Sequence, residues 1–274
     1  MQDRLESFGG SGPSVLFAHA NGYPPGSYRQ FIGHLLPHCE LTGYRHRPMW
    51  GDRHPPKRLN WSLFADDLIH TVESTLDQPV WMMGHSMGGV VALMAAERRP
   101  ELFKGLILID PVFMPSRRVF AMGVMPSKRK AEMPMIRRAL GRPDHFASHE
   151  EAFTFYRGKR AFGRFSDEVL WDYVHASNSS VPEGGVQLSF PAAWEAAVYG
   201  SAPWVWPRLL RVRLPTLGLR GEHSDVLTPG AMRRWARLQP SAELHHCPGG
   251  HLLPMELPET TAGYVIDFLQ RHPG

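Results

Sequence analysis

The sequence contains little cysteine and no long hydrophobic run. Its two cysteines, Cys39 and Cys247, lie far apart, so a disulfide framework is not implied and a reducing compartment is favoured. No stretch reaches the roughly 18 to 20 uncharged apolar residues that a membrane-spanning helix needs, so we expect no stable membrane insertion. The first residues, MQDRLESFGGSGP, have neither the basic start nor the apolar core of a secretory signal. We therefore expect a cytoplasmic protein.

The chain also lacks the charge imbalance and the motifs of a nucleic-acid-binding protein. The net charge is only +4, and residues 113–210 hold 13 Lys/Arg against 9 Asp/Glu while the remainder holds 17 of each. No RNA- or DNA-binding motif accompanies this local excess, so nucleic acid is not an expected partner. Histidine pairs such as His34 with His38 and His245 with His246 match no known metal-binding motif, so we expect no metal.

What the chain does contain is an alternation of buried strands and amphipathic helices, which is typical of a mostly parallel sheet covered by helices on both faces. The apolar runs predict strands at 14–19, 39–45, 79–84, 105–110, 214–221 and 242–249. Helical periodicity predicts helices at 27–36, 61–76, 87–99, 229–240 and 260–272.

The alternation is interrupted between residues 113 and 210, where the sequence is helix-like, aromatic and basic, without a convincing buried strand. The simplest interpretation is one α/β core formed by residues 1–112 and 211–274. Residues 113–210 would then be a helical insertion between two strands of that core.

The motif GHSMGG at 84–89 joins a predicted strand to a predicted helix. It lacks the lysine of a P-loop and the spacing of a dinucleotide-binding loop, but it fits G-x-S-x-G with Ser86 in the centre. A serine on a tight strand-to-helix turn needs glycine two positions away on each side, because a β-carbon there would collide with the turn. Ser86 is therefore the candidate nucleophile.

A serine hydroxyl needs a base and an orienting acid, which follow this motif in the order Ser, Asp or Glu, His. We predict Asp225, in a loop after a late strand, as the acid and His251, after the turn Gly249–Gly250, as the base. Asp110, at the end of the strand GLILID, is the main rival for the acid. Because Pro111 follows it directly, Asp110 is interpreted instead as the residue that ends the strand and caps the entry to the insertion. His223 and Glu222 are weaker competitors.

An oxyanion hole needs two backbone N–H groups that point at the developing negative charge. The residue after the nucleophile, Met87, supplies one at the positive end of a helix. The second is expected from the loop after the first core strand, where the sequence reads HANG at 19–22.

Together HANG, GHSMGG, a late Asp and a final GGH resemble the α/β-hydrolase superfamily, specifically its cap-bearing esterase-like members, over essentially the whole chain. The resemblance implies an oxyanion hole formed by the amides of Asn21 and Met87, and residues 113–210 as a cap above the site. Ala20 departs from the usual glycine of the HG motif. Only 18 residues precede His19, so we expect one N-terminal edge strand to be shortened or missing.

We therefore expect a cofactor-free serine hydrolase that cleaves a carboxylic ester of a small to medium, largely apolar substrate through an acyl-enzyme. The alternatives are a lactone, an amide or a C–C bond, perhydrolysis, or a non-catalytic ligand-binding protein. A homodimer is left open. The basic pairs of the insertion, such as Arg117–Arg118 and Arg137–Arg138, are expected to form a solvated surface. Steering of anionic substrates or contact with a lipid surface is the alternative.

Overall fold

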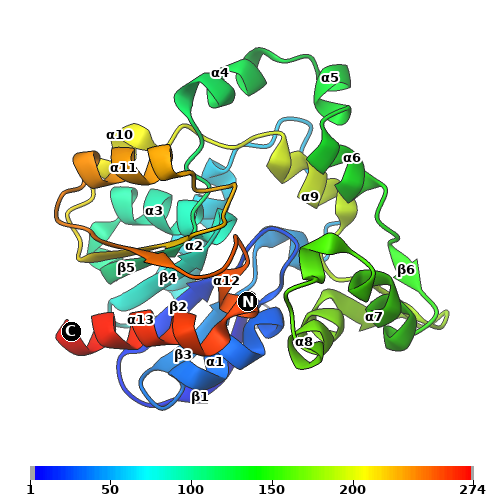
Figure 1. Cartoon of the computed structure of the whole chain (residues 1–274), viewed down its shortest axis with the longest axis horizontal. Coiled ribbons are helices and arrows are strands. Elements are labelled where there is room, and N and C mark those ends of the chain that lie inside the picture. Colours follow the sequence, from blue (N-terminus) through cyan, green and yellow to red (C-terminus); the bar gives the residue numbers. More distant parts are fainter. Residues whose placement is uncertain (1–3, 273–274) are drawn as a thin grey trace.

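The computed structural model describes residues 4–272, and its centre is a seven-stranded sheet (Figure 1). The strand order is β1-β3-β2-β4-β5-β9-β10, and every neighbouring pair is parallel except β1 with β3. The strands are β1 (Leu5–Gly10), β2 (Ser14–Ala18), β3 (Glu40–Tyr44), β4 (Val80–His85), β5 (Phe103–Ile109), β9 (Thr216–Gly221) and β10 (Glu243–Cys247). The predicted mostly parallel sheet is confirmed, and a single antiparallel strand, β1, of six residues precedes β2.

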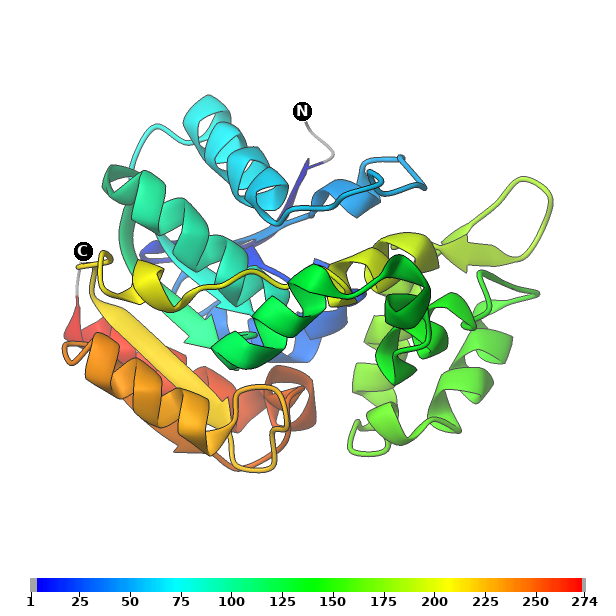
Figure 2. The ribbon, with the colours of Figure 1, turned by 90° about the horizontal axis from the view of Figure 1, so that it is seen from above.

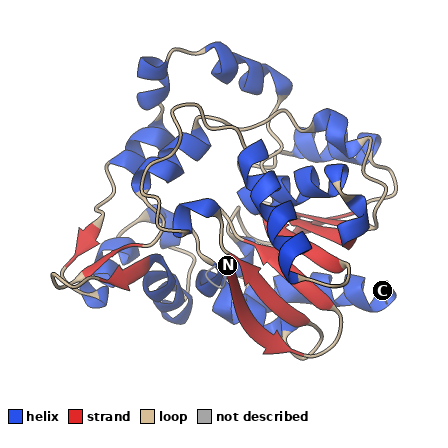
Figure 3. Cartoon of the chain, turned by 180° about the vertical axis from the view of Figure 1, so that it is seen from behind, coloured by secondary structure: helices blue, strands red, loops and turns tan. Residues whose placement is uncertain are grey.

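Helices cover both faces of this sheet, as Figure 3 shows from behind. The core helices are α1 (Arg29–Leu35), α2 (Ser62–Thr75), α3 (Met87–Arg98), α11 (Pro229–Leu238), α12 (Leu253–Glu256) and α13 (Pro258–Arg271). The strand β2 illustrates how the sheet separates two layers of core side chains, because alternate side chains of a strand point to opposite faces. Leu16 packs into the core on the side of α2 and α3, whereas Val15 and Phe17 pack on the side of α1 and α13.

All seven strands of the central sheet come from outside residues 113–210, which we call the inserted segment. Its helices are α4 (Ser116–Val124), α5 (Ser127–Ala131), α6 (Pro134–Leu140), α7 (His149–Arg157), α8 (Asp167–Ser177), α9 (Ala192–Tyr199) and α10 (Trp206–Leu209). In Figure 2 the green part that holds α7 and α8 stands to one side of the core. The division of the chain at residues 113 and 210 into core and cap stays a prediction.

The inserted segment also contains a small second sheet that the sequence pattern did not predict. It is formed by β6 (His145–Phe146), β8 (Val186–Leu188) and β7 (Asn178–Ser180), in that order and antiparallel. Strands of two or three residues are too short to produce a recognisable apolar period. Within residues 4–272, no helix has both the length and the apolar character that crossing a membrane requires.

Candidate active site

Ser86 occupies a strained turn between β4 and α3. Its backbone has φ 56° and ψ −113°, a conformation that costs energy for any residue with a β-carbon. The turn is held by the neighbouring strand β5, because the Ser86 N–H donates to the carbonyl of Ile109 at 2.9 Å. The side chain therefore stands at the carboxyl end of the sheet, where parallel α/β folds bind ligands.

The glycines of the motif are required by close backbone contacts. A β-carbon at Gly84 would lie 2.4 Å from the carbonyl oxygen of Gly88, and one at Gly88 would lie 2.0 Å from that of Ala18. Both distances are far below van der Waals contact. The sequence argument for glycine at these two positions is thus explained by the packing of α3 against the ends of β2 and β4.

Ser86 belongs to a continuous hydrogen-bond chain with a histidine and a carboxylate. The Oγ of Ser86 lies 2.9 Å from Nε2 of His251, and Nδ1 of His251 lies 2.6 Å from Oδ2 of Asp110. A carboxylate only accepts, so His251 carries its proton on Nδ1 and offers Nε2 as the acceptor for the serine hydroxyl. The chain can transfer a proton from Ser86 to His251 while Asp110 fixes the histidine tautomer.

The carboxylate in this chain is Asp110, and the expectation for Asp225 is corrected by the geometry. Asp110 is fully buried, and it also accepts hydrogen bonds from the N–H of Gly221 at 2.9 Å and from the hydroxyl of Ser224 at 2.5 Å. Asp225 is the next residue in the same loop, but its side chain is exposed. The loop after β9 therefore directs Ser224, and not Asp225, toward Asp110.

Backbone strain marks the same two residues. Among the non-glycine residues that the structure describes, positive φ values occur at Ser86 and Asp110, which has φ 40°. Residues with a β-carbon keep such a conformation only when their surroundings enforce it, and functional sites are where this is common. The strain at Asp110 is a signal of its role that the sequence does not show.

Of the two predicted oxyanion-hole residues, Met87 directly follows Ser86, and Asn21 belongs to the loop that begins beside the start of α3. Gly88 touches the backbone of Ala18 and His19, so the start of α3 and the loop after β2 are in direct contact. Met87 is the first residue of α3, where N–H groups have no partner within the helix. Ala20 is buried and not among the residues with positive φ, so the departure from the usual glycine introduces no strain there.

A second hydrogen-bond chain, which the sequence analysis missed, connects the three loops of the site. His85 donates from Nε2 to the carbonyl of His251 at 2.8 Å, and its Nδ1 accepts from the hydroxyl of Tyr28 at 2.7 Å. The Tyr28 oxygen in turn accepts the N–H of Ala20 at 3.1 Å. Burial lowers the pKa of His85 well below its usual value, so the ring stays neutral and this arrangement of donors is fixed. Tyr28 and His85 thus tie the HANG loop and the His251 loop to the nucleophile turn.

The HANG loop is held from its other side by a pair of buried histidines. His46 donates from its backbone N–H to Nε2 of His19 at 3.2 Å and from its ring to the carbonyl of His19 at 3.1 Å. Burial lowers the pKa of His19 to about 4, and that of His46 well below its usual value. Both rings are neutral at physiological pH, as buried polar groups without a charged partner require.

The inserted segment meets the HANG loop at a buried ion pair. The guanidinium Nη2 of Arg142 lies 2.6 Å from Oε2 of Glu195, and the two side chains are 14% and 12% exposed. The backbone carbonyl of Glu195 accepts from the side-chain amide of Asn21 at 3.1 Å, and its carboxylate lies against Gly22. Burial raises the pKa of Glu195, an effect that Arg142 opposes. The position of α9 is therefore coupled to the loop that carries Asn21.

The loop of His251 is held in a similar way. Gly249 has φ 106°, and the N–H of Gly250 donates to Oε2 of Glu256 at 2.6 Å. Arg164 of the inserted segment pairs with the same carboxylate at 3.2 Å. The turn Gly249–Gly250 that the sequence singled out therefore positions His251 with the help of a downstream acid.

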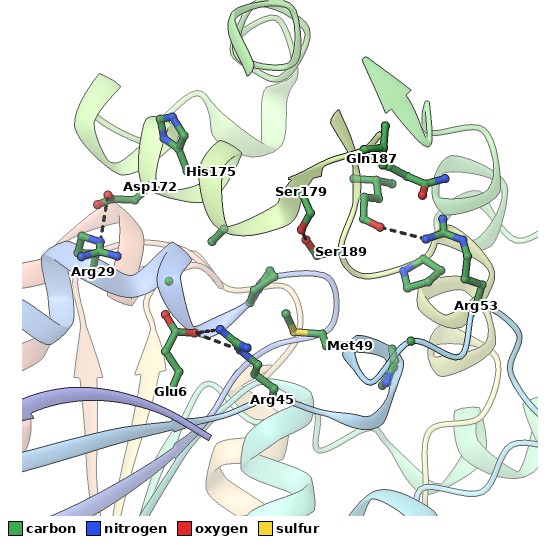
Figure 4. Close-up of a pocket in the computed structure, with 18 residues that line it drawn as sticks. Glu6, Arg29, Arg45, Met49, Arg53, Asp172, His175, Ser179, Gln187 and Ser189 are labelled. Carbon is green, nitrogen blue, oxygen red and sulfur yellow. Dashed lines mark hydrogen bonds and ion pairs between the residues drawn. The ribbon is translucent and has the colours of Figure 1, made fainter. Parts of the chain in front are cut away.

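A separate groove of about 760 Å³ lies between Glu6 of β1 with the segments 24–29 and 45–53 on one side and the part of the inserted segment with α8, β7 and β8 on the other (Figure 4). Ser86, Asp110 and His251 do not line it. Its arginines are paired with carboxylates, Arg45 with Glu6 at 3.1 Å and Arg29 with Asp172 at 3.8 Å. Because these charges are already compensated, the groove offers no chemistry comparable to that of the serine, histidine and aspartate.

Comparison with curated proteins gives distant relatives that are hydrolases. The chain is 26% identical to mouse monoglyceride lipase over 107 residues, which is 36% of this chain and 35% of the lipase. It therefore spans about a third of the length of that relative. It is 22% identical over 263 residues to 2-(acetamidomethylene)succinate hydrolase of Mesorhizobium japonicum, which covers 95% of this chain and 89% of that enzyme.

Comparison with solved structures supports the fold over the whole length. The crystal structure of E-2-(acetamidomethylene)succinate hydrolase superposes with a TM-score of 0.80 at 20% identity, covering 97% of this chain and 94% of the other. A family model described as the alpha/beta hydrolase family matches residues 15–263, a range that contains Ser86, Asp110 and His251. The chain belongs to the alpha/beta hydrolase family.

Proposed function

We propose that this protein is a serine hydrolase that cleaves a carboxylic ester of a small to medium, largely apolar substrate through an acyl-enzyme. The observation that carries the proposal is the hydrogen-bond chain from Ser86 through His251 to Asp110, at 2.9 Å and 2.6 Å. Membership of a hydrolase family and the relatives with hydrolase activity support it.

In the first half of the reaction, the Oγ of Ser86 forms a bond to the substrate carbonyl carbon and its proton passes to Nε2 of His251. The carbonyl electron pair moves to oxygen, which becomes an oxyanion that the N–H groups of Asn21 and Met87 stabilise. Asp110 stays ionised and stabilises the imidazolium. When the oxyanion collapses, the C–O bond to the alcohol breaks and His251 returns the proton to the leaving oxygen.

In the second half, a water molecule takes the place of the alcohol. His251 accepts a proton from the water, the remaining hydroxide attacks the acyl carbon, and a second oxyanion forms in the same position. Its collapse breaks the bond to Ser86, which recovers its proton from His251. No cofactor is needed, since every proton in the cycle is held by His251 or the reacting oxygens.

The experiment that tests this proposal is labelling with a fluorophosphonate, which reacts with activated serines. The wild-type protein should be labelled at Ser86, and Ser86→Ala should not be labelled. Ser224→Ala is a useful second variant because it removes a nearby serine that only supports Asp110. Absence of labelling in a folded wild-type protein would favour the non-catalytic, ligand-binding alternative.

A second candidate reaction on the same three residues is hydrolysis of an amide. It is favoured by the similarity over 95% of the chain to a hydrolase of 2-(acetamidomethylene)succinate. A panel of p-nitrophenyl esters of increasing chain length, run beside acetamido compounds and lactones, separates the candidates by their kcat/KM values. The ester proposal fails if amides are preferred at matched acyl groups.

A further inference from the structure

The first part of the inserted segment, residues 116–140, presents an unusual concentration of exposed apolar side chains. We call these residues the arch. It contains α4, α5 and α6, and α4 and α5 form the top edge of the molecule in Figure 1. Four of the six large apolar side chains that are exposed in residues 4–272 lie here, and a fifth, Trp204, packs on Phe120 with ring centroids 5.5 Å apart. The six are Phe120, Val124, Met135, Leu140, Trp204 and Leu210.

The arch is also strongly basic. It carries seven Lys or Arg residues and one acid, Glu132. Six of the seven are exposed and make no ion pair within residues 4–272. Elsewhere in the inserted segment Arg142, Arg157, Arg164 and Arg208 are paired, and two exposed basic residues, Lys159 and Arg160, are not. The six are Arg117, Arg118, Lys128, Arg129, Arg137 and Arg138.

The basic and the apolar side chains share helix faces. Residues three, four or seven apart lie on the same side of a helix, which places Arg117, Phe120 and Val124 together on α4, opposite the buried Met122. The same spacing places Met135 beside Arg138 on α6. Phe120 is 57% exposed and Val124 is 86% exposed, so this face of α4 is open to solvent.

We propose that the arch binds an anionic lipid surface, with Phe120 and Val124 inserted at the headgroup boundary and the surrounding arginines and lysines on the phosphates. An apolar face rimmed by unpaired basic side chains is the pattern of helices that lie in a membrane interface. A nucleic acid would use the charges but would leave the apolar side chains in water, which is why the lipid surface is favoured over it. The proposal concerns binding and does not depend on the proposed reaction.

Vesicle sedimentation tests it directly. The full-length protein should sediment with phosphatidylcholine vesicles that contain about a third phosphatidylserine, and be released by added salt, but not with pure phosphatidylcholine. Each basic residue near such a surface contributes about five-fold to the partition coefficient, so Arg137→Gln with Arg138→Gln should lower it roughly 25-fold. Phe120→Ser with Val124→Ser should weaken binding at unchanged charge.

Matched controls come from the same chain. Lys57→Gln with Arg58→Gln removes an exposed basic pair from another loop, and Leu210→Ser removes an exposed apolar side chain outside the arch. Both should leave vesicle binding unchanged, and all variants should keep the wild-type unfolding transition.

Three results would overturn the proposal. The first is equal binding to neutral and anionic vesicles. The second is a loss in the Lys57/Arg58 control as large as in the arch. The third is binding of a short DNA duplex to the arch without binding of vesicles, which would mean that the basic side chains bind nucleic acid.

Discussion

Nδ1 of His251 lies 2.6 Å from Oδ2 of Asp110, a residue 141 positions earlier in the chain. The two meet because β5, which ends just before Asp110, is the neighbour of β9, and β10 follows beyond it. The carboxyl ends of β4, β5 and β10 therefore bring Ser86, Asp110 and His251 to one edge of the sheet.

This relationship predicts that Asp110→Asn is far more damaging than Asp225→Asn. The amide would favour the wrong tautomer of His251, so kcat for a p-nitrophenyl ester should fall about 10³- to 10⁴-fold. Asp225 is exposed and its substitution should change kcat less than about two-fold. Steady-state kinetics on both variants decides the matter, and the assignment is wrong if Asp225→Asn is the crippled one.

Gly88→Ala should destabilise the fold as well as abolish activity. Its β-carbon would lie 2.0 Å from a backbone oxygen of Ala18, so the start of α3 must move away from β2. Urea unfolding should show a loss of several kcal/mol, since neither backbone can yield easily.

Gly263→Ala is the matched control for that substitution. Gly263 lies inside α13 with nothing within 4 Å of the added β-carbon. Alanine should stabilise the helix by about 0.5 to 1 kcal/mol. Equal losses in the two variants would argue that glycine content, and not the contact at Gly88, sets the effect.

Tyr28→Phe should lower activity without removing any group of the triad. The variant leaves the N–H of Ala20 and Nδ1 of His85 without partners, at a cost of about 1 to 3 kcal/mol in unfolding free energy. Because Ala20 precedes Asn21, we expect kcat to fall more than KM rises. Tyr44→Phe is the control, because it removes a buried hydroxyl that has no hydrogen-bond partner among the described residues. It should change neither the unfolding free energy nor kcat much.

The buried histidines predict that stability declines on mild acidification. Burial lowers the pKa of His19 to about 4, from an ordinary value near 6.5. Because its pKa is lower in the folded protein, His19 takes up a proton at a higher pH in the unfolded chain. Its contribution to the unfolding free energy is therefore complete above pH 6.5 and is lost as the pH falls toward 4. Between pH 7.5 and pH 5, His19 alone should account for about 2 kcal/mol of unfolding free energy.

Urea unfolding at these two pH values measures the effect. His19→Asn should reduce the pH dependence, whereas His54→Asn, which replaces an exposed histidine, should not. A pH dependence that is identical in wild type and His19→Asn would exclude this source.

The strands, the covering helices and two of the three residues in the Ser86–His251–Asp110 hydrogen-bond chain could be predicted because their signals are local. The apolar runs at 79–84 and 105–110 and the glycines around Ser86 reflect contacts within one strand-turn-helix unit. His251 was identifiable by its position after Gly249–Gly250. The carboxylate that pairs with His251 was not, because Asp110 and Asp225 both follow buried strands, and the one local feature that ranked them, Pro111 beside Asp110, favoured the wrong residue.

The sequence by itself determined the order of elements, the tight turn at Ser86 and the candidate histidine, because steric requirements and apolar periodicity depend on neighbouring residues. Only the tertiary structure decided which carboxylate pairs with that histidine, and it alone revealed the supporting chain through Tyr28 and His85. The loop after β9 turns Ser224 inward and Asp225 outward, and Asp110 is held at φ 40° by groups more than 100 positions away. Such orientations depend on how distant loops pack, which no local pattern records.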